Sequence, residues 1–150
     1  MEYDHIMTPD EIDDLFREAV KQLAGKTDIR VTMIQTERKR LSDDRVCCII
    51  TSAIWNDSPQ KACLSVNSYI INNKREQHQR DRGCPGHDIS GFVNIQPDAH
   101  VIKGDVFFEE YTDIVSAGWV YGIEITDTNW NVYDIQFELN ANGKWHEIER

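Results

Sequence analysis

Hydrophobic and polar positions follow two different periods along this chain, and the period changes near Gly25. Before Gly25, apolar residues recur about every 3.6 positions with charged residues between them, as in an amphipathic helix. These apolar residues are Ile12, Leu15, Phe16, Ala19, Val20 and Leu23. Thr8 is suited to cap the helix, Pro9 to occupy its first position, and Gly25 to end it. We therefore predict a helix over residues 9–24.

After Gly25 the period is two, which is typical of β-strands. Segments that alternate in this way, or that are apolar on both faces, are 29–33, 45–55, 61–71, 89–95, 115–126, 131–140 and 145–148. The last three are connected by the short turn sequences DTNW and ANGK, as in a meander. Residues 105–114 fit either a strand or a short helix.

The order of these elements predicts the fold class. One helix is followed by strands in succession without a second crossover helix, so the strands are expected to pair antiparallel. We predict an α+β domain in which the N-terminal helix packs on one face of a curved, mostly antiparallel meander sheet of about five to seven strands. A chain of 150 residues, 40% of them hydrophobic, is long enough to form one domain over residues 1–150 with its own core.

Residues 72–88, with the sequence NNKREQHQRDRGCPGHD, interrupt the strand pattern with a long polar loop. A loop of this length inside a compact domain is uncommon and tends to carry function. Its Arg, His and Gln side chains suit contact with another protein better than catalysis. We predict a recognition loop in which Arg75, His78, Arg80 and Arg82 bind a partner.

His78, Cys84 and His87 are of the residue types that bind zinc. A closed zinc site needs a fourth ligand, and no second closely spaced Cys/His pair supplies one. We therefore predict no metal and keep these three residues as zinc candidates.

Cys84 and His87, with Asp88, also match the residue types of a thiolate nucleophile and its base. Such catalysis depends on geometry, and a turn with incidental polar residues is the simpler interpretation.

Asp105, Glu109 and Asp113 would share one helix face if residues 105–114 were helical, and such carboxylates suit Mg²⁺ or Ca²⁺. No EF-hand spacing and no glycine-rich phosphate loop accompanies them, so no cofactor is predicted. An acidic surface that also binds a protein is the favoured interpretation.

Trp130 lies in the DTNW turn, where its side chain would be exposed, and we predict that it anchors an interface.

The formal net charge is -10, and residues 98–150 carry 11 of the acidic residues but only 3 basic ones. This charge opposes direct binding to nucleic acid or to an anionic membrane and favours a partner with a basic surface. Basic residues at 38–40 and in 72–88 suggest a phosphate-binding patch, but the overall charge outweighs that interpretation.

The first residues lack an apolar leader segment, and the longest apolar run, VCCII, is far too short to span a bilayer. We expect a cytoplasmic protein whose cysteines are reduced.

No catalytic constellation or nucleic-acid module emerges from the sequence, which favours a non-enzymatic binding protein. The most concrete hypothesis is a small acidic inhibitor, of the immunity or anti-defence type, that neutralises a basic protein by stoichiometric binding. A protein that handles nucleic acid would be such a target. The predicted contacts are Glu109, Glu110, Asp113 and Trp130 together with the four residues of the recognition loop.

The alternative hypothesis is a protein that binds a small molecule or nucleotide, or an enzyme, with its site in a cleft between the helix and the curved sheet. Polar groups for this cleft would come from His100, Tyr121, Glu124 or His146. A ligand that stabilises the protein against heat would distinguish this hypothesis from the inhibitor.

Overall fold

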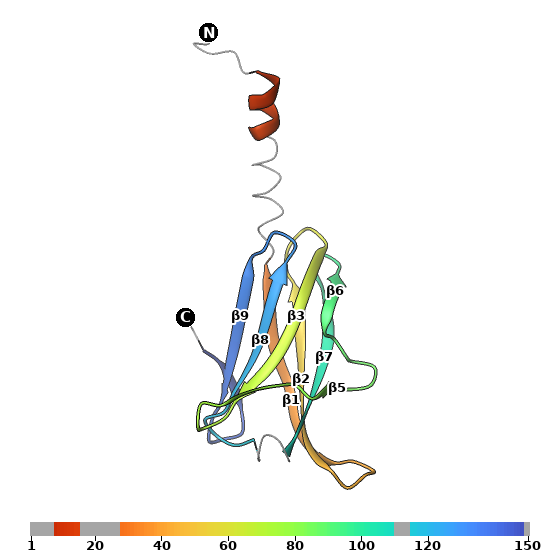
Figure 1. Ribbon diagram of the computed structural model, residues 1–150, viewed down its shortest axis with the longest axis vertical. Coiled ribbons are helices and arrows are strands. Elements are labelled where there is room, and N and C mark those ends of the chain that lie inside the picture. The colour runs from red at the N-terminus through yellow and green to blue at the C-terminus, as the bar shows by residue number, and fades with distance from the viewer. Residues whose placement is uncertain (1–7, 16–27, 110–114, 149–150) are drawn as a thin grey trace.

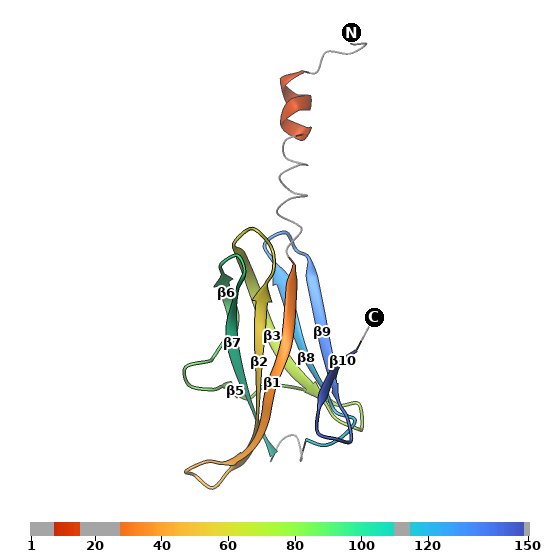
Figure 2. The ribbon, with the colours of Figure 1, turned by 180° about the vertical axis from the view of Figure 1, so that it is seen from behind.

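Two antiparallel sheets face each other in this protein, as Figure 1 and the reverse view in Figure 2 show. The computed structural model describes residues 8–15, 28–109 and 115–148. The four-stranded sheet has the order β1-β2-β7-β5 and consists of β1 (Ile29–Arg40), β2 (Val46–Asn56), β7 (Ala99–Phe108) and β5 (Arg82–Gly83). Every strand pairing in it is antiparallel.

The six-stranded sheet has the order β10-β9-β8-β3-β4, and β6 pairs with the other end of β3. Its strands are β3 (Ala62–Ile71), β4 (Gln77–Gln79), β6 (Gly91–Ile95), β8 (Val120–Asp127), β9 (Val132–Leu139) and β10 (Trp145–Glu147). All of its pairings are antiparallel as well, so the predicted antiparallel arrangement is confirmed.

The hydrophobic core lies between the two sheets because each strand turns alternate side chains inward. Ile50 and Ile54 of β2 and Ile123 and Ile125 of β8 are fully buried. The main apolar cluster combines residues of both sheets. Burying these two apolar faces against each other is the main favourable contribution to folding.

The predicted packing of a helix on the sheet is wrong, and so is the single meander sheet. Residues 9–15 are helical, and the Thr8 hydroxyl accepts a hydrogen bond of 3.3 Å from the Glu11 backbone N–H. However, Ile12 and Leu15 remain 54% and 59% exposed, and Figure 1 shows the helix apart from both sheets. The sheets cover each other's apolar faces, so the core closes without a helical layer. Residues 16–24 of the predicted helix lie outside the described residues.

Among the described residues, helix 9–15 forms no cleft with either sheet, so the cleft expected in the small-molecule hypothesis is not found there. Residues 105–108, which fitted either a strand or a helix, belong to β7 and pair with β2. Residues 110–114 lie outside the described part of the chain. Within the described part of the chain, no helix is long and apolar enough to cross a membrane.

Candidate binding surface

The predicted recognition loop, 72–88, contains β4 and β5 and is tied to the two sheets. His78 Nε2 lies 3.1 Å from Asp81 Oδ1, and Asp81 Oδ2 accepts a hydrogen bond of 2.7 Å from the Phe108 backbone N–H. Cys84 donates its backbone N–H to the Gly104 carbonyl at 2.9 Å. Much of the polar character of this segment therefore serves contacts within the chain.

A buried polar cluster lies on the inner face of β7. Lys103 and Asp105 are both fully buried, and Lys103 Nζ lies 2.8 Å from Asp105 Oδ1. Lys103 also donates to the Ile89 carbonyl at 2.6 Å, and the Tyr121 hydroxyl donates to Asp105 Oδ2. Burial lowers the pKa of Lys103 and raises the pKa of Tyr121, because each charged form is poorly solvated there.

Arg80 connects this cluster to the 72–88 segment. Its guanidinium lies 3.2 Å from Asp105 and 2.6 Å from Asp88, and only 14% of its side chain is exposed. Lys103, Asp105 and Tyr121 are fully buried, so they offer no surface to a substrate, and we assign the cluster a structural role. Arg80, predicted as a partner contact, is largely occupied inside the chain.

Two of the predicted loop contacts, Arg75 and Arg82, stay exposed. Arg82 lies over the Phe108 ring at 5.4 Å from its centre, and Arg45 lies over the same ring at 4.2 Å. Two guanidinium groups thus share one aromatic ring on the four-stranded sheet.

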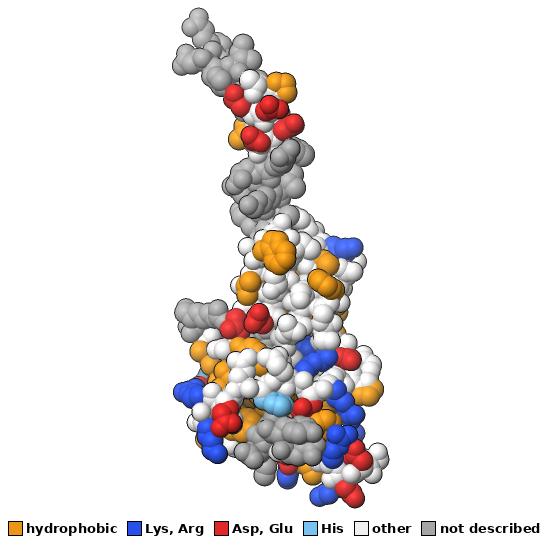
Figure 3. All heavy atoms as spheres, in the orientation of Figure 1, with side chains coloured by type: hydrophobic (Ala, Val, Ile, Leu, Met, Phe, Trp, Pro, Cys, Tyr) orange, Lys and Arg blue, Asp and Glu red, His pale blue; other side chains and the backbone are white. Residues whose placement is uncertain are grey.

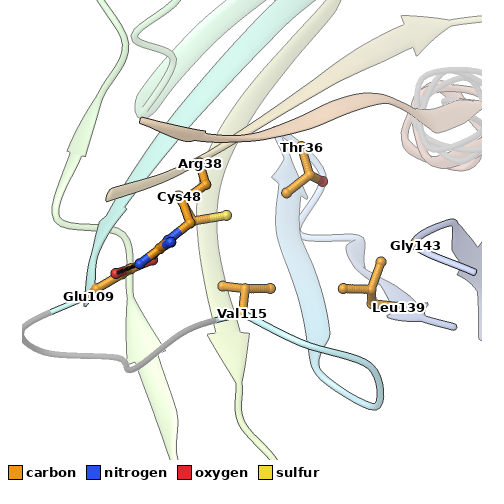
Figure 4. A pocket seen from close by; sticks show the side chains of 7 residues that line it. All are labelled: Thr36, Arg38, Cys48, Glu109, Val115, Leu139 and Gly143. Atoms are coloured by element: carbon orange, nitrogen blue, oxygen red, sulfur yellow. Dashed lines mark hydrogen bonds and ion pairs between the residues drawn. The ribbon is translucent and has the colours of Figure 1, made fainter. Parts of the chain in front are cut away.

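Glu109, predicted as an acidic contact, is bound to Arg38 by two parallel hydrogen bonds, one of them 2.9 Å long. These bonds lower the pKa of Glu109. The pair forms one wall of a cavity of about 240 Å³, and Leu139 lies on the opposite side (Figure 4). Burial raises the pKa of Cys48 in this cavity to about 12, so its thiol stays protonated at neutral pH and is a poor nucleophile. Glu110 and Asp113 lie outside the described residues.

Other candidate chemistry is dispersed. Among the described residues, no group of three or more His, Cys, Asp or Glu side chains could hold a metal ion. His100 stacks on Trp55 with ring centres 4.2 Å apart, Tyr121 is in the core, and His146 lies 3.9 Å from Glu138. These positions do not converge on one catalytic site.

The outer face of the six-stranded sheet has a hollow of about 420 Å³ beside the β8–β9 turn. We call it the aromatic hollow, and its lining residues are Cys63, Ser65, Phe92, Thr126, Asp127, Thr128 and Trp130. Phe92 and Trp130 are 84% and 85% exposed. Figure 3 shows hydrophobic side chains on this face, over the end of the sheet nearest the helix. Large exposed aromatic side chains that line one hollow are a common feature of binding surfaces.

Strand register explains the shape of the aromatic hollow. Ser65 of β3 lies opposite Phe92 of β6 on one side and Thr126 of β8 on the other, and Val132 of β9 continues the row. Directly opposed residues point to the same face, and neighbouring strands are about 4.8 Å apart. The small side chains of Ser65 and Thr126 therefore form a floor between the larger Phe92 and Val132.

Trp130 occupies an unusual backbone position. Its φ is +65°, in the left-handed region, and its backbone N–H donates to the Asp127 carbonyl at 3.1 Å. This turn position favours Gly or Asn, and another residue there costs about 1–2 kcal/mol. The Asp127 carboxylate holds the turn by accepting 2.9 Å hydrogen bonds from the backbone N–H groups of Asn129 and Asn131. The Trp130 indole is thus exposed to solvent at the expense of an unfavourable backbone conformation.

The two sheets differ in charge. The strands of the six-stranded sheet contain no Lys or Arg; their acidic residues are Glu124, Asp127, Asp134, Glu138 and Glu147. The strands of the four-stranded sheet contain the acids Glu37 and Asp105 and the bases Arg30, Arg38, Lys39, Arg40, Arg82 and Lys103. The aromatic hollow therefore lies on the acidic sheet.

Trp130 is a predicted site residue, whereas Phe92 was missed. The sequence signal for Phe92 is its phase: Ile95 faces the core, so Phe92, three residues earlier, faces outward. A large aromatic side chain on the outward phase of a strand could have been noticed from the sequence alone. Its nearness to Trp130 could not, because that depends on the pairing of β6 with β3 and of β3 with β8.

Comparisons with known proteins provide no family. No family model matches the chain, and no curated protein matches it in sequence. A FixG-related protein from Vibrio parahaemolyticus is 13% identical, with 72% of this chain and 91% of that chain covered and a TM-score of 0.46. A putative late embryogenesis abundant protein is 11% identical, with coverage of 98% and 93% and a TM-score of 0.45. The archaeal flagellum of Methanospirillum hungatei strain JF1 contains a chain 10% identical, with coverage of 91% and 79% and a TM-score of 0.46.

Proposed function

We propose that this protein is a non-enzymatic binding protein that contacts a basic protein partner through the outer face of its six-stranded sheet. The observation that carries the proposal is Trp130, whose exposed indole is kept at a backbone position that favours glycine. A costly conformation that serves no packing within the fold is best explained by a function of the side chain. Phe92, on the other side of the same hollow, extends the apolar contact.

The charge of this surface supports a basic partner. The strands that form it lack Lys and Arg, and the whole chain has a net charge of -10. A positive surface would be attracted to it at long range and would bind faster at low salt. Stoichiometric inhibition of a basic protein, as in immunity or anti-defence proteins, is the form of binding that we propose.

Within this proposal, Trp130 is the central contact and the predicted contact Glu109 is a lesser one. Glu109 already has its charge balanced by Arg38, so it contributes less to a partner than the sequence suggested. The remaining loop residues, Arg75 and Arg82, are positively charged and would oppose a basic partner at short range. We therefore place the interface on the aromatic hollow and not on the 72–88 segment.

Affinity capture from a lysate of the source cells, or of their natural host, tests this proposal. The baits are the wild-type protein, Trp130→Gly and the control Ile34→Ala, which removes another exposed apolar side chain (52% exposed) from the opposite sheet. We expect one basic protein, recovered in stoichiometric amount by wild type and Ile34→Ala, weakened by salt and lost with Trp130→Gly. Equal recovery by all three baits would refute the proposed surface.

A further inference from the structure

We infer that the aromatic hollow receives an arginine side chain of the partner, with the guanidinium stacked on Trp130 and paired with Glu124. This inference rests on the proposed function and names the group that the surface recognises. It is supported by a complete example of the same contact elsewhere in the chain, by a carboxylate beside the hollow that is unpaired among the described residues, and by the chemistry of arginine.

The complete example is on the four-stranded sheet. Arg30 lies directly opposite Trp55 in the strand register, and its guanidinium carbon is 4.7 Å from the centre of the Trp55 ring. The same guanidinium donates to both carboxylate oxygens of Asp57, at 2.9 and 3.3 Å. Asp57 is two residues beyond Trp55, so an aromatic residue and an acid near each other on the sheet bind one arginine from two directions.

The aromatic hollow has the same two components, and no cation of the described part of the chain is paired with them. Glu124 of β8 points outward on the same face as Thr126. It precedes Thr126 by two residues, which corresponds to about 7 Å along the strand. Glu124 is exposed and forms no ion pair or side-chain hydrogen bond with another described residue. Two other carboxylates lie nearby: that of Asp127 accepts the hydrogen bonds of the turn, and that of Asp134, directly opposite Glu124, accepts a hydrogen bond of 2.6 Å from the Tyr69 hydroxyl. Glu124 is therefore the carboxylate that remains for a ligand.

Arginine fits this arrangement better than lysine does. A guanidinium is planar and weakly hydrated, so it can stack on an aromatic ring and still direct its N–H groups sideways to a carboxylate. An ammonium is compact and strongly hydrated, and it would lose more hydration on entering an apolar hollow. The volume of about 420 Å³ has room for a whole arginine side chain and part of its neighbours.

Binding of short peptides tests the inference directly. We would titrate the full chain with nona-arginine and with nona-lysine, which carry equal charge, and follow the Trp130 indole N–H signal by NMR and the affinity by calorimetry. We expect nona-arginine to bind about 5-fold or more tightly than nona-lysine and to shift the Trp130 signal. Equal affinities, or an unmoved Trp130 signal, would overturn the inference.

Two charge-matched variants locate the contact. Glu124→Gln should weaken nona-arginine binding about 5-fold, whereas Glu138→Gln, which removes the same charge from the same face farther along β9, should leave it nearly unchanged. Trp130→Gly should remove most of the preference for arginine. Equal losses in both Gln variants would indicate diffuse attraction to an acidic surface and refute the site.

The outcomes separate this inference from the proposed function. If the Trp130→Gly bait loses its partner but the two peptides bind alike, the interface stands and the arginine site fails. If that bait keeps its partner, the proposed function itself fails. Analytical ultracentrifugation of the free protein tests whether a second copy of this chain occupies the hollow. A dimer that Trp130→Gly dissociates would show that it does, and would also overturn the arginine site.

Discussion

On the four-stranded sheet Arg30 is stacked on Trp55 and held by a carboxylate, whereas on the six-stranded sheet Phe92 and Trp130 are exposed and Glu124 has no cation among the described residues. Both sheets pack on the same core and are built from antiparallel strands. They differ in whether these particular groups are satisfied among the described residues. The sheet that leaves Phe92 and Trp130 exposed and Glu124 without a cation there is the better candidate for binding another molecule.

The interior shows the same contrast more strongly. On the inner face of β7, Lys103 and Asp105 are paired out of contact with water, and Arg80 adds a second positive charge. The strands of the other sheet contribute the Tyr121 hydroxyl to this cluster but no cation. Charged groups of the four-stranded sheet thus contribute to the fold, and removing one of them should affect stability more than removing a charge from the six-stranded sheet.

The largest expected effect is that of Asp105→Asn. It leaves Lys103 and Arg80 without their shared carboxylate and should reduce the free energy of unfolding by about 3–5 kcal/mol, measured by urea denaturation. Replacing the pair by apolar residues, as Lys103→Met with Asp105→Leu, should cost less than Asp105→Asn because no unpaired charge from that pair stays buried. A loss below about 1 kcal/mol for Asp105→Asn would show that the cluster contributes little to stability.

The next effect is a loss of stability at alkaline pH that involves Tyr69 of the six-stranded sheet. Burial, with the hydrogen bond to Asp134, raises the pKa of Tyr69 from 10.0 to about 12. Because the folded-state pKa is the higher one, the contribution of Tyr69 to stability is fully present below pH 10 and is lost as the pH rises to about 12. Two pKa units correspond to at most about 2.7 kcal/mol. Urea denaturation between pH 8 and 11.5 should show this loss, reduced in Tyr69→Phe; an identical loss in the variant would contradict it.

A smaller effect of opposite sign is expected at the exposed turn. Trp130→Gly relieves the left-handed backbone and should raise the free energy of unfolding by about 1 kcal/mol, since the exposed indole contributes little packing. Trp130→Ala keeps a side chain at the same φ and should give no such gain. A destabilised Trp130→Gly protein would mean that the indole supports the fold, and its exposure would no longer indicate a binding role.

The sequence predicted most strands because their apolar residues alternate, as in β3 and β9. It missed the first half of β7 and left residues 105–108 undecided between strand and helix, because Lys103 and Asp105 occupy inward positions although charged residues are typical of a polar surface. Their burial depends on partners such as Arg80 that are distant along the chain. Several charged groups of the long polar segment 72–88 also bind within the fold, whereas its role in recognition stays a prediction.

The position of the helix was wrong for a different physical reason. An amphipathic pattern shows that an apolar face needs a partner, but not which surface provides it. The strands already formed two sheets that cover each other, a division that depends on long-range pairing such as β2 with β7. For the binding surface, the turn that exposes Trp130 was visible in the sequence, whereas the hollow it shares with Phe92 was not.

The smallest expected effect tests the Arg30–Trp55 contact, from which the arginine site is inferred. Arg30→Lys keeps the charge opposite Trp55 but cannot stack on the ring and bind Asp57 with two parallel hydrogen bonds. This contact is exposed, so the urea midpoint should fall only slightly, far less than in Asp105→Asn. The Trp55 indole N–H, which donates to Thr32 at 2.9 Å, should nevertheless change its NMR shift as the guanidinium leaves the ring. If Arg30→Lys leaves that shift unchanged, arginine and lysine are equivalent beside an aromatic ring and an acid on this fold, and the selectivity proposed for the aromatic hollow loses its physical basis.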